Sequence, residues 1–322
     1  MLKHVGVMMV LAFAPAGADS TKAATPEQTL SVKGGSLNQV AYSRDGKQLA
    51  SAGYDKVVRI WDATTGKAVV ELTGHEGLAE SVVFTPDGSR VISSARDGVI
   101  KSWDVARRAA TFSIPAHKET VWNIRLNPRG DRIVSAGQDG SVKIWNASTG
   151  KAVRTMKHGG PVWLAVFSPD GKTIASASFD NTVKLWNAKS GKNVRTLAGH
   201  TREVIAVDFS VDGRLVASGA NDSTVRIWNV STGKLVKSLP QTSTVNSVAF
   251  SPDGRSLAVG VGDPVEAMAR TATITTFDVA TWAPRAKLEA SCGVLFDATY
   301  RPDSAKLAAA CADGSVRIWS TP

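Results

Sequence analysis

Histidine and cysteine are both scarce in this chain of 322 residues, which contains five histidines and two cysteines. No Cys-x-x-Cys-His motif occurs, which excludes the usual covalent attachment of haem. No glycine-rich phosphate-binding motif occurs either. Beyond the first 20 residues, no apolar run approaches the length of a membrane helix, and no stretch has a helical hydrophobic period.

Basic residues, by contrast, are in excess, with a net charge of +10 and a pI near 9.7. Hydrophobic residues make up 43% of the chain and charged residues 20%. This composition is typical of a globular protein that is long enough to bury a sizeable core.

The amino terminus, "MLKHVGVMMVLAFAPAGADS", has the layout of a secretory signal peptide. A basic start at Lys3 and His4 precedes an apolar run, and Ala16-Gly17-Ala18 gives the small-residue cleavage pattern. The apolar run is too short to cross the roughly 30 Å of hydrocarbon in a bilayer. We therefore expect a signal peptide at 1–18, a flexible linker at 19–26, and export to a bacterial periplasm or the extracellular space.

Tryptophans recur at nearly constant intervals through the rest of the chain. The repeated aromatic positions are Trp61, Trp103, Trp145, Trp186, Trp228, Phe277 and Trp319. Five of the six intervals are 41 or 42 residues, and the interval that ends at Phe277 is 49. A fixed period of this length is typical of a repeat architecture, here with seven units.

Each unit contains four short runs of alternating hydrophobicity, separated by turn signals. In one unit these are "VIAVDFS", the turn "SVDG", "RLVASGA", a turn at an Asp, "TVRIWN" and the turn "STGK". Period-two alternation bounded by such turns predicts four antiparallel strands in each unit.

The pairs Gly74-His75 and Gly199-His200, together with Trp61-Asp62 and Trp103-Asp104, resemble the tryptophan–aspartate (WD) repeat family. The resemblance covers roughly residues 27–322. It implies an all-β, seven-bladed β-propeller with four antiparallel strands per blade around a central channel.

The seventh blade lacks a fourth strand of its own, because Trp319 lies three residues before the end. The one unassigned strand-like segment is "EQTLSVKG" at 27–34, where Leu30 corresponds to Leu72 and Leu197 in other fourth strands. We predict that this segment completes blade seven and closes the ring.

Four units share a His, Ser, Asp and Trp at constant spacing: His75, Ser93, Asp97, Trp103; His117, Ser135, Asp139, Trp145; His158, Ser176, Asp180, Trp186; and His200, Ser218, Asp222, Trp228. A hydrolase needs one activated Ser, so four copies argue against catalysis. The family resemblance implies a structural hydrogen-bonded tetrad in each of these blades. Blades one, six and seven have Lys33, Gln241 and Ser291 at the His position.

The tetrads use every histidine except His4, so none is left for a metal site or a general base. We expect no catalytic residue, no metal and no cofactor. The alternative is an enzyme or small-molecule binder that uses carboxylates of the innermost strands, namely Glu80, Asp208 or Asp297.

The two cysteines occupy blade seven, which lacks the tetrad. Cys292 follows the His-equivalent position, and Cys311 comes two residues before Asp313. Because the His–Asp link of the tetrad brings these places together in other blades, we predict a Cys292–Cys311 disulfide, which export permits. The alternative is a pair of reduced thiols.

In the WD-repeat family, partners often dock on the face formed by the loops between strands four and one and between strands two and three. The resemblance places on this face the residue before each turn Asp and the residue five positions after each His. The candidate partner-binding residues are Tyr54, Glu80, Arg96, Trp122, Gln138, Trp163, Phe179, Ile205 and Asn221. Trp122 and Trp163 are the leading candidates, because neither is the repeat's structural Trp and Trp is enriched in interface hot spots. The alternative for each aromatic is ordinary packing between blades.

Two further surface features are expected. Eight extra residues near "PVEAMART" bulge from blade six on the same face. On the opposite face, basic residues recur at turns: Lys47, Lys67, Lys151, Lys172, Lys192, Arg214, Lys234 and Arg255. This basic face could attract an anionic envelope component, or it could simply be solvated.

The sequence therefore predicts an exported, non-enzymatic scaffold that binds one or more proteins. We expect a monomer without a nucleic-acid partner and, after cleavage, without a membrane span.

Overall fold

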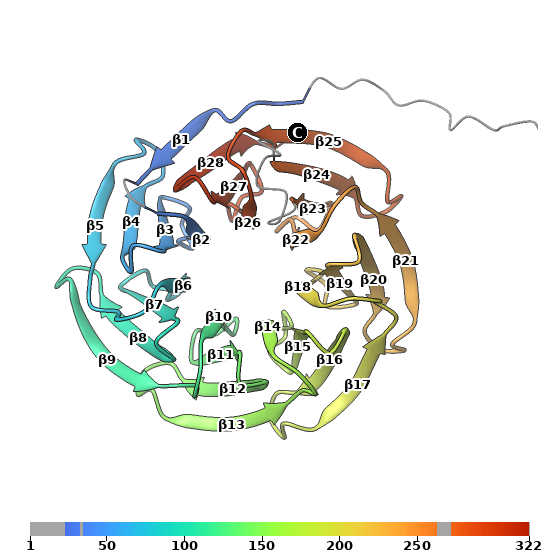
Figure 1. Cartoon of the computed structure of the whole chain (residues 1–322), viewed down its shortest axis with the longest axis horizontal. Helices are drawn as coiled ribbons and strands as arrows, with labels where there is room; N and C mark the ends of the chain where they lie inside the picture. Colours follow the sequence, from blue (N-terminus) through green and yellow to red (C-terminus); the bar gives the residue numbers. More distant parts are fainter. Residues whose placement is uncertain (1–22, 33–34, 263–271, 322) are drawn as a thin grey trace, which may run out of the picture.

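The computed structural model describes residues 23–32, 35–262 and 272–321. These residues form seven four-stranded antiparallel sheets arranged in a ring (Figure 1). The predicted all-β, seven-bladed propeller is confirmed. The expected signal peptide, Lys33 and most of the blade-six insertion lie outside the described residues.

Each blade contributes one strand to each of four concentric positions. The innermost strands are β2 (Leu37–Tyr42), β6 (Ala79–Phe84), β10 (Val121–Leu126), β14 (Val162–Phe167), β18 (Val204–Phe209), β22 (Val245–Phe250) and β26 (Leu295–Tyr300). The second strands are β3 (Gln48–Gly53), β7 (Arg90–Ala95), β11 (Arg132–Gly137), β15 (Thr173–Ser178), β19 (Leu215–Ala220), β23 (Ser256–Val261) and β27 (Lys306–Cys311). The third strands are β4 (Val58–Asp62), β8 (Val99–Asp104), β12 (Ser141–Asn146), β16 (Thr182–Asn187), β20 (Thr224–Asn229), β24 (Ala272–Asp278) and β28 (Ser315–Ser320). The outermost strands are β5 (Ala68–Leu72), β9 (Ala109–Pro115), β13 (Ala152–Lys157), β17 (Asn193–Ala198), β21 (Leu235–Pro240), β25 (Pro284–Ala290) and β1 (Gln28–Ser31).

The turns between second and third strands need a left-handed residue directly after the Asp. In six blades this residue has φ between 59° and 79°: Lys56, Gly98, Gly140, Asn181, Ser223 and Gly314. Gly and Asn adopt this conformation at least cost, which explains their frequency at the position.

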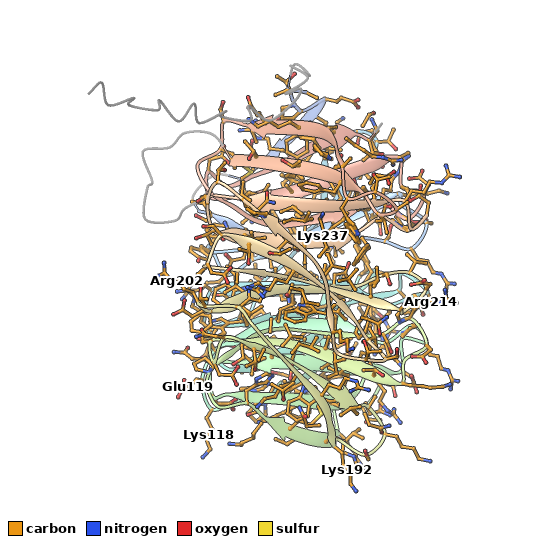
Figure 2. The ribbon with its side chains drawn as sticks, turned by 90° about the vertical axis from the view of Figure 1, so that its right-hand side faces the viewer. Lys118, Glu119, Lys192, Arg202, Arg214 and Lys237 are labelled. Atoms are coloured by element: carbon orange, nitrogen blue, oxygen red, sulfur yellow. A yellow bond between two sulfur atoms is a disulfide. The ribbon has the colours of Figure 1, made fainter. Side chains whose placement is uncertain are left out.

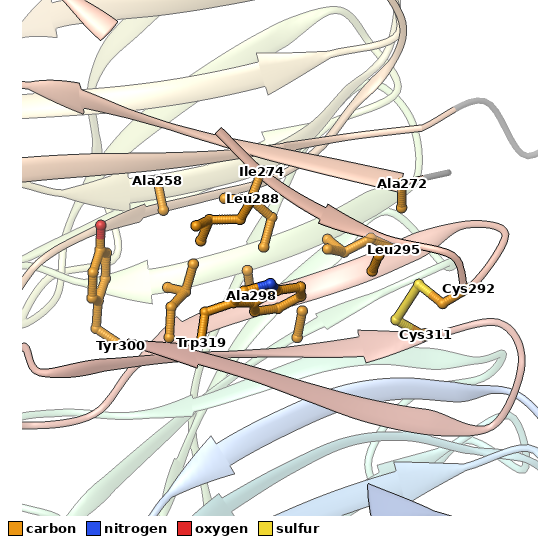
Figure 3. Close-up of a cluster of buried hydrophobic side chains, with 13 residues drawn as sticks. Ala258, Ala272, Ile274, Leu288, Cys292, Leu295, Ala298, Tyr300, Cys311 and Trp319 are labelled. Atoms are coloured by element: carbon orange, nitrogen blue, oxygen red, sulfur yellow. A yellow bond between two sulfur atoms is a disulfide. The ribbon is translucent and has the colours of Figure 1, made fainter. Parts of the chain in front are cut away.

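The core lies between neighbouring blades. One cluster joins Ile60 and Leu72 of blade one to Val82 and Trp103 of blade two. Figure 3 shows the corresponding cluster between blades six and seven, where Ile274 and Leu288 face Leu295 and Trp319. Since each blade supplies half of two clusters, no blade has a complete core of its own.

The amino-terminal strand closes the ring, as predicted. β1 pairs antiparallel with β28, with Gln28 opposite Ile318 and Leu30 opposite Val316. The side chain of Leu30 is 2% exposed. Ala24, in the segment expected to be a linker, forms backbone hydrogen bonds with β25.

The ring has two faces with different loops. In the side view, Lys118, Glu119 and Arg202 project on one side, and Arg214 projects on the other (Figure 2). The first three belong to loops from a fourth strand to the next innermost strand, and Arg214 belongs to a turn between first and second strands. We call the first side the mouth face and the other the opposite face.

Candidate interaction site at the channel mouth

A β-bulge occurs near the start of every innermost strand. In β10, for example, Val121 pairs with Gly137 and Asn123 pairs with Ala136, which leaves Trp122 without a partner. A bulge redirects the side chain of its extra residue. The seven bulge residues are Asn38, Glu80, Trp122, Trp163, Ile205, Asn246 and Phe296. All seven line a cavity of about 270 Å³ in the central channel.

Three predicted aromatic residues form one stacked cluster at this cavity. The ring centroids of Trp122 and Trp163 are 4.8 Å apart, and Phe179 lies 5.4 Å from Trp122 and 5.9 Å from Trp163. All three side chains are partly exposed. Their contact crosses from blade three to blade four, so the rings also pack between blades, as the alternative interpretation expected. We call Trp122, Trp163 and Phe179 the aromatic cluster.

A polar cluster faces it from blades one and two. The guanidinium of Arg96 donates a hydrogen bond to the Glu80 carboxylate and a second to the Tyr54 hydroxyl at 2.8 Å. Its Cζ atom also lies 4.8 Å from the centre of the Tyr54 ring, and Asn38 donates to Glu80. Burial raises the pKa of Glu80, while Arg96 opposes the shift. Glu80 is therefore occupied by neighbouring side chains, which argues against its use as a free catalytic base.

The other predicted mouth residues lie outside both clusters. Gln138 is exposed, and the amide of Asn221 lies 3.3 Å from the Glu203 carboxylate. Ile205 lines the cavity without joining the aromatic cluster. Phe296, which stands at an equivalent bulge, lies 6.5 Å from Tyr54 between ring centres.

Deeper in the channel lie three charged side chains from three different blades. Asp297 lies 3.8 Å from Arg125, and Asp208 accepts backbone N–H bonds from Phe209 and Phe250. Burial raises the pKa of Asp208 to about 6 and also raises that of Asp297. Sequence reasoning missed Arg125, although a lone cation in the alternating run "VWNIRL" could have indicated it. Because Asp208 bonds to the backbone of the next blade, its position is explained structurally.

The tetrads are hydrogen-bonded in all four blades. The His Nδ1 atoms lie 2.9–3.2 Å from the Asp carboxylates. The His Nε2 atoms lie 2.6–2.8 Å from the Ser hydroxyls, which also accept the Trp indole N–H at 2.7–2.9 Å. Burial lowers the pKa of His158 to about 4 and lowers those of His117 and His200. A neutral imidazole that donates from Nδ1 to Asp and accepts from Ser at Nε2 gives both ring nitrogens, the Ser hydroxyl and the Trp indole N–H a hydrogen-bond partner.

Blade seven has a disulfide in place of the tetrad. Cys292 and Cys311 are joined, with Cα atoms 5.7 Å apart, and both belong to the buried cluster in Figure 3. Ala309 stands where the tetrad Ser would be, and the Trp319 indole N–H has no hydrogen-bond partner among the described residues.

Two turns of the opposite face contain an ion pair. Lys172 lies 3.9 Å from Asp170, and Arg214 lies 3.7 Å from Asp212 of the same turn. These two turns are therefore locally neutralised, whereas Lys151, Lys192 and Lys234 of the expected basic face have no described carboxylate within 4 Å.

Within the described residues, no group of three or more His, Cys, Asp or Glu side chains is arranged to hold a metal ion. In the same part of the chain, no helix is long and apolar enough to cross a membrane.

Comparison with known proteins decides the family. Seven segments match the family described as WD domain, G-beta repeat: 24–62, 66–104, 109–146, 150–187, 191–229, 233–264 and 282–320. The chain belongs to the WD-repeat family. WD-repeat propellers generally bind protein partners and act as scaffolds rather than enzymes.

A segment of the chain about one repeat long is also similar to a curated protein. "Notchless protein homolog" from Arabidopsis thaliana is 49% identical over 41 residues, which is 13% of this chain and 9% of that protein. The match is about one repeat long, and the chain spans far less than two thirds of the relative. The match therefore shows that the two proteins share a similar repeat and does not show that they share a function.

Proposed function

We propose that this WD-repeat propeller is an exported, non-enzymatic scaffold that binds a protein partner at the channel mouth. The observation that carries the proposal is the partly exposed aromatic cluster at the cavity, together with Arg96 of the neighbouring blade two. Trp and Arg supply most of the binding energy in many interfaces, especially near the centre of the contact.

Substitution at the aromatic cluster tests the docking site. Trp122→Ala and Trp163→Ala each remove a large ring from the mouth, and truncation of a hot-spot Trp typically costs about 2 kcal/mol or more, roughly a 30-fold loss of affinity. We expect affinity purification from an envelope extract to lose partners that the unmodified protein retains. Those partners are then identified by mass spectrometry and titrated against each variant.

Trp282→Ala is the matched control, because this partly buried Trp lies in the turn between β24 and β25, away from the mouth. The control should keep the partners. If both mouth variants retain them with unchanged affinity while folding normally, the proposed docking site is wrong.

Export is proposed from the amino-terminal sequence and is supported by the disulfide, which forms in oxidising compartments. Cell fractionation and intact-mass measurement test it. The exported protein should begin at Asp19 and contain no free thiol. A cytosolic protein with an intact amino terminus would contradict the proposal.

A second candidate function, binding of a small molecule in the channel, is favoured by one observation. The Asp297 Oδ2 atom is buried and, among described residues, has no hydrogen-bond partner, although Arg125 lies 3.8 Å away as an ion pair. If this candidate is correct, Asp297→Asn will change ligand binding while the mouth variants leave it intact.

A further inference from the structure

Three adjacent outer hairpins carry charge of one sign only. They run from the third to the outermost strand of blades three, four and five, at residues 146–157, 187–198 and 229–240. The first two contribute Lys151, Arg154, Lys157, Lys189, Lys192 and Arg195. The third contributes Lys234 and Lys237, and none of the three contains an Asp or Glu. We call these three hairpins the basic belt.

The rest of the rim differs from the belt. Each of the other three outer hairpins contains at least one carboxylate, such as Glu71 in β5, Asp104 at the end of β8, or Glu289 in β25, and Glu27 directly precedes β1 of blade seven. Part of the reason is local: Asn146, Asn187 and Asn229 cap the belt turns where Asp62, Asp104 and Asp278 cap turns elsewhere.

The belt cations are not neutralised within the described structure. No described carboxylate lies within 4 Å of any of the eight. Arg154 and Arg195 bond instead to backbone carbonyl groups of Lys189 and Ser231 in the next blade. Seven of the eight side chains are exposed, and Lys192 and Lys237 are labelled in Figure 2.

Aliphatic side chains are exposed between these cations. Val153, Val194, Leu235 and Val236 are 41%, 56%, 45% and 49% exposed, and they lie on β13, β17 and β21 beside the belt's basic residues. These strands are neighbours along the rim (Figure 1). Four of the six large hydrophobic side chains exposed in the described structure thus fall within the belt.

We propose that the basic belt binds the surface of an anionic lipid bilayer. Lys and Arg are attracted to anionic head groups over about one Debye length, roughly 8–10 Å. Exposed aliphatic side chains add affinity for the boundary between head groups and acyl chains. A soluble polyanion would use the cations and leave the aliphatic residues without a role. The belt lies on the rim, so the proposal is independent of docking at the mouth.

Vesicle sedimentation with the full chain tests the proposal. The vesicles are phosphatidylcholine alone, or phosphatidylcholine with about 40% phosphatidylglycerol. The first composition gives the baseline for the apolar amino-terminal segment, and the difference between the two reports the belt. The unmodified protein should bind the anionic vesicles more tightly, with an affinity that falls as salt is added.

The belt variant carries Lys189→Glu, Lys192→Glu and Lys234→Glu. Each cation near an anionic surface contributes about a 5-fold gain in affinity, so removing three should weaken binding by about 100-fold or more. The control carries Arg44→Glu, Lys47→Glu and Lys67→Glu in blade one, which gives the same change in net charge at exposed positions. The control should keep most of the binding.

A second variant, Val194→Ser with Val236→Ser, separates a bilayer from a soluble polyanion. It should bind the anionic vesicles roughly 10-fold more weakly at high salt, where the apolar contribution dominates. Unchanged binding would assign the belt to a soluble polyanion and overturn the lipid proposal. Equal losses in the belt and control variants, or no preference of the unmodified protein for anionic vesicles, would also overturn it.

Discussion

At the scale of single residues, the tetrad of blade four is a chain of donors and acceptors that requires a neutral His158. The indole N–H of Trp186 donates to Ser176, whose hydroxyl donates to Nε2 of His158, and Nδ1–H donates to Asp180. Protonation of His158 would put a hydrogen on Nε2 and force the Ser hydroxyl to find another acceptor. The buried side chain therefore favours the neutral imidazole, in agreement with its lowered pKa.

This protonation state predicts how stability depends on pH. The pKa of His158 is about 4 in the fold and about 6.5 when unfolded, so between these values the unfolded chain binds more protons. The contribution of His158 to the free energy of unfolding is therefore fully present above about pH 6.5 and is lost as the pH falls towards 4. One such group contributes on the order of 3 kcal/mol to this loss.

Denaturant unfolding between pH 4 and 8 measures the effect. His158→Gln removes one titrating group, so the variant should be less stable at pH 7 but should lose less stability on acidification. Parallel pH profiles for the two proteins would show that His158 does not contribute to the acid sensitivity.

The sequence alone could specify the tetrads but not the contacts of the mouth. Tetrad members lie within 28 residues of one another at constant spacing, so a repeat alignment finds them. Arg125 and Asp297 are 172 residues apart and meet only because the ring closes. The contact between the tilted rings of Trp122 and Trp163 likewise depends on the angle between two blades, which no local pattern encodes.

At the scale of strands and turns, one recurring irregularity builds the candidate site. Every innermost strand is bulged at its second residue, so seven side chains reach the channel mouth from otherwise regular strands. A bulge adds one residue to a strand and leaves the alternating pattern on each side readable. The sequence therefore predicted the strands and the mouth positions without predicting the bulge that orients them.

The outer hairpins show the reverse situation. Their exposed side chains are unconstrained by the core, so charge and polarity can vary from blade to blade while the fold is kept. The charge difference between the basic belt and the other outer segments is readable in the sequence, but its continuity over three neighbouring blades follows only from the ring.

At the scale of the whole molecule, the shared clusters make the blades interdependent. Unlike an open solenoid, a closed ring has no terminal repeat that could unfold first with one free face. The closing strand β1 is therefore the element on which cooperativity most depends, because it pairs with β28 of blade seven and leads directly into β2 of blade one.

Leu30→Ala tests this dependence, since its side chain is buried where β1 packs between blades seven and one. A buried Leu→Ala change costs about 2–5 kcal/mol. Leu235→Ala is the matched control, because Leu235 also lies on an outermost strand but is 45% exposed, and it should cost less than about 1 kcal/mol. Calorimetry and tryptophan fluorescence should both show one transition, shifted as a whole in Leu30→Ala. Because Trp61 and Trp228 lie on different sides of the ring, a separate early transition confined to part of the tryptophan signal would mean that blades unfold independently and that closure does not couple them.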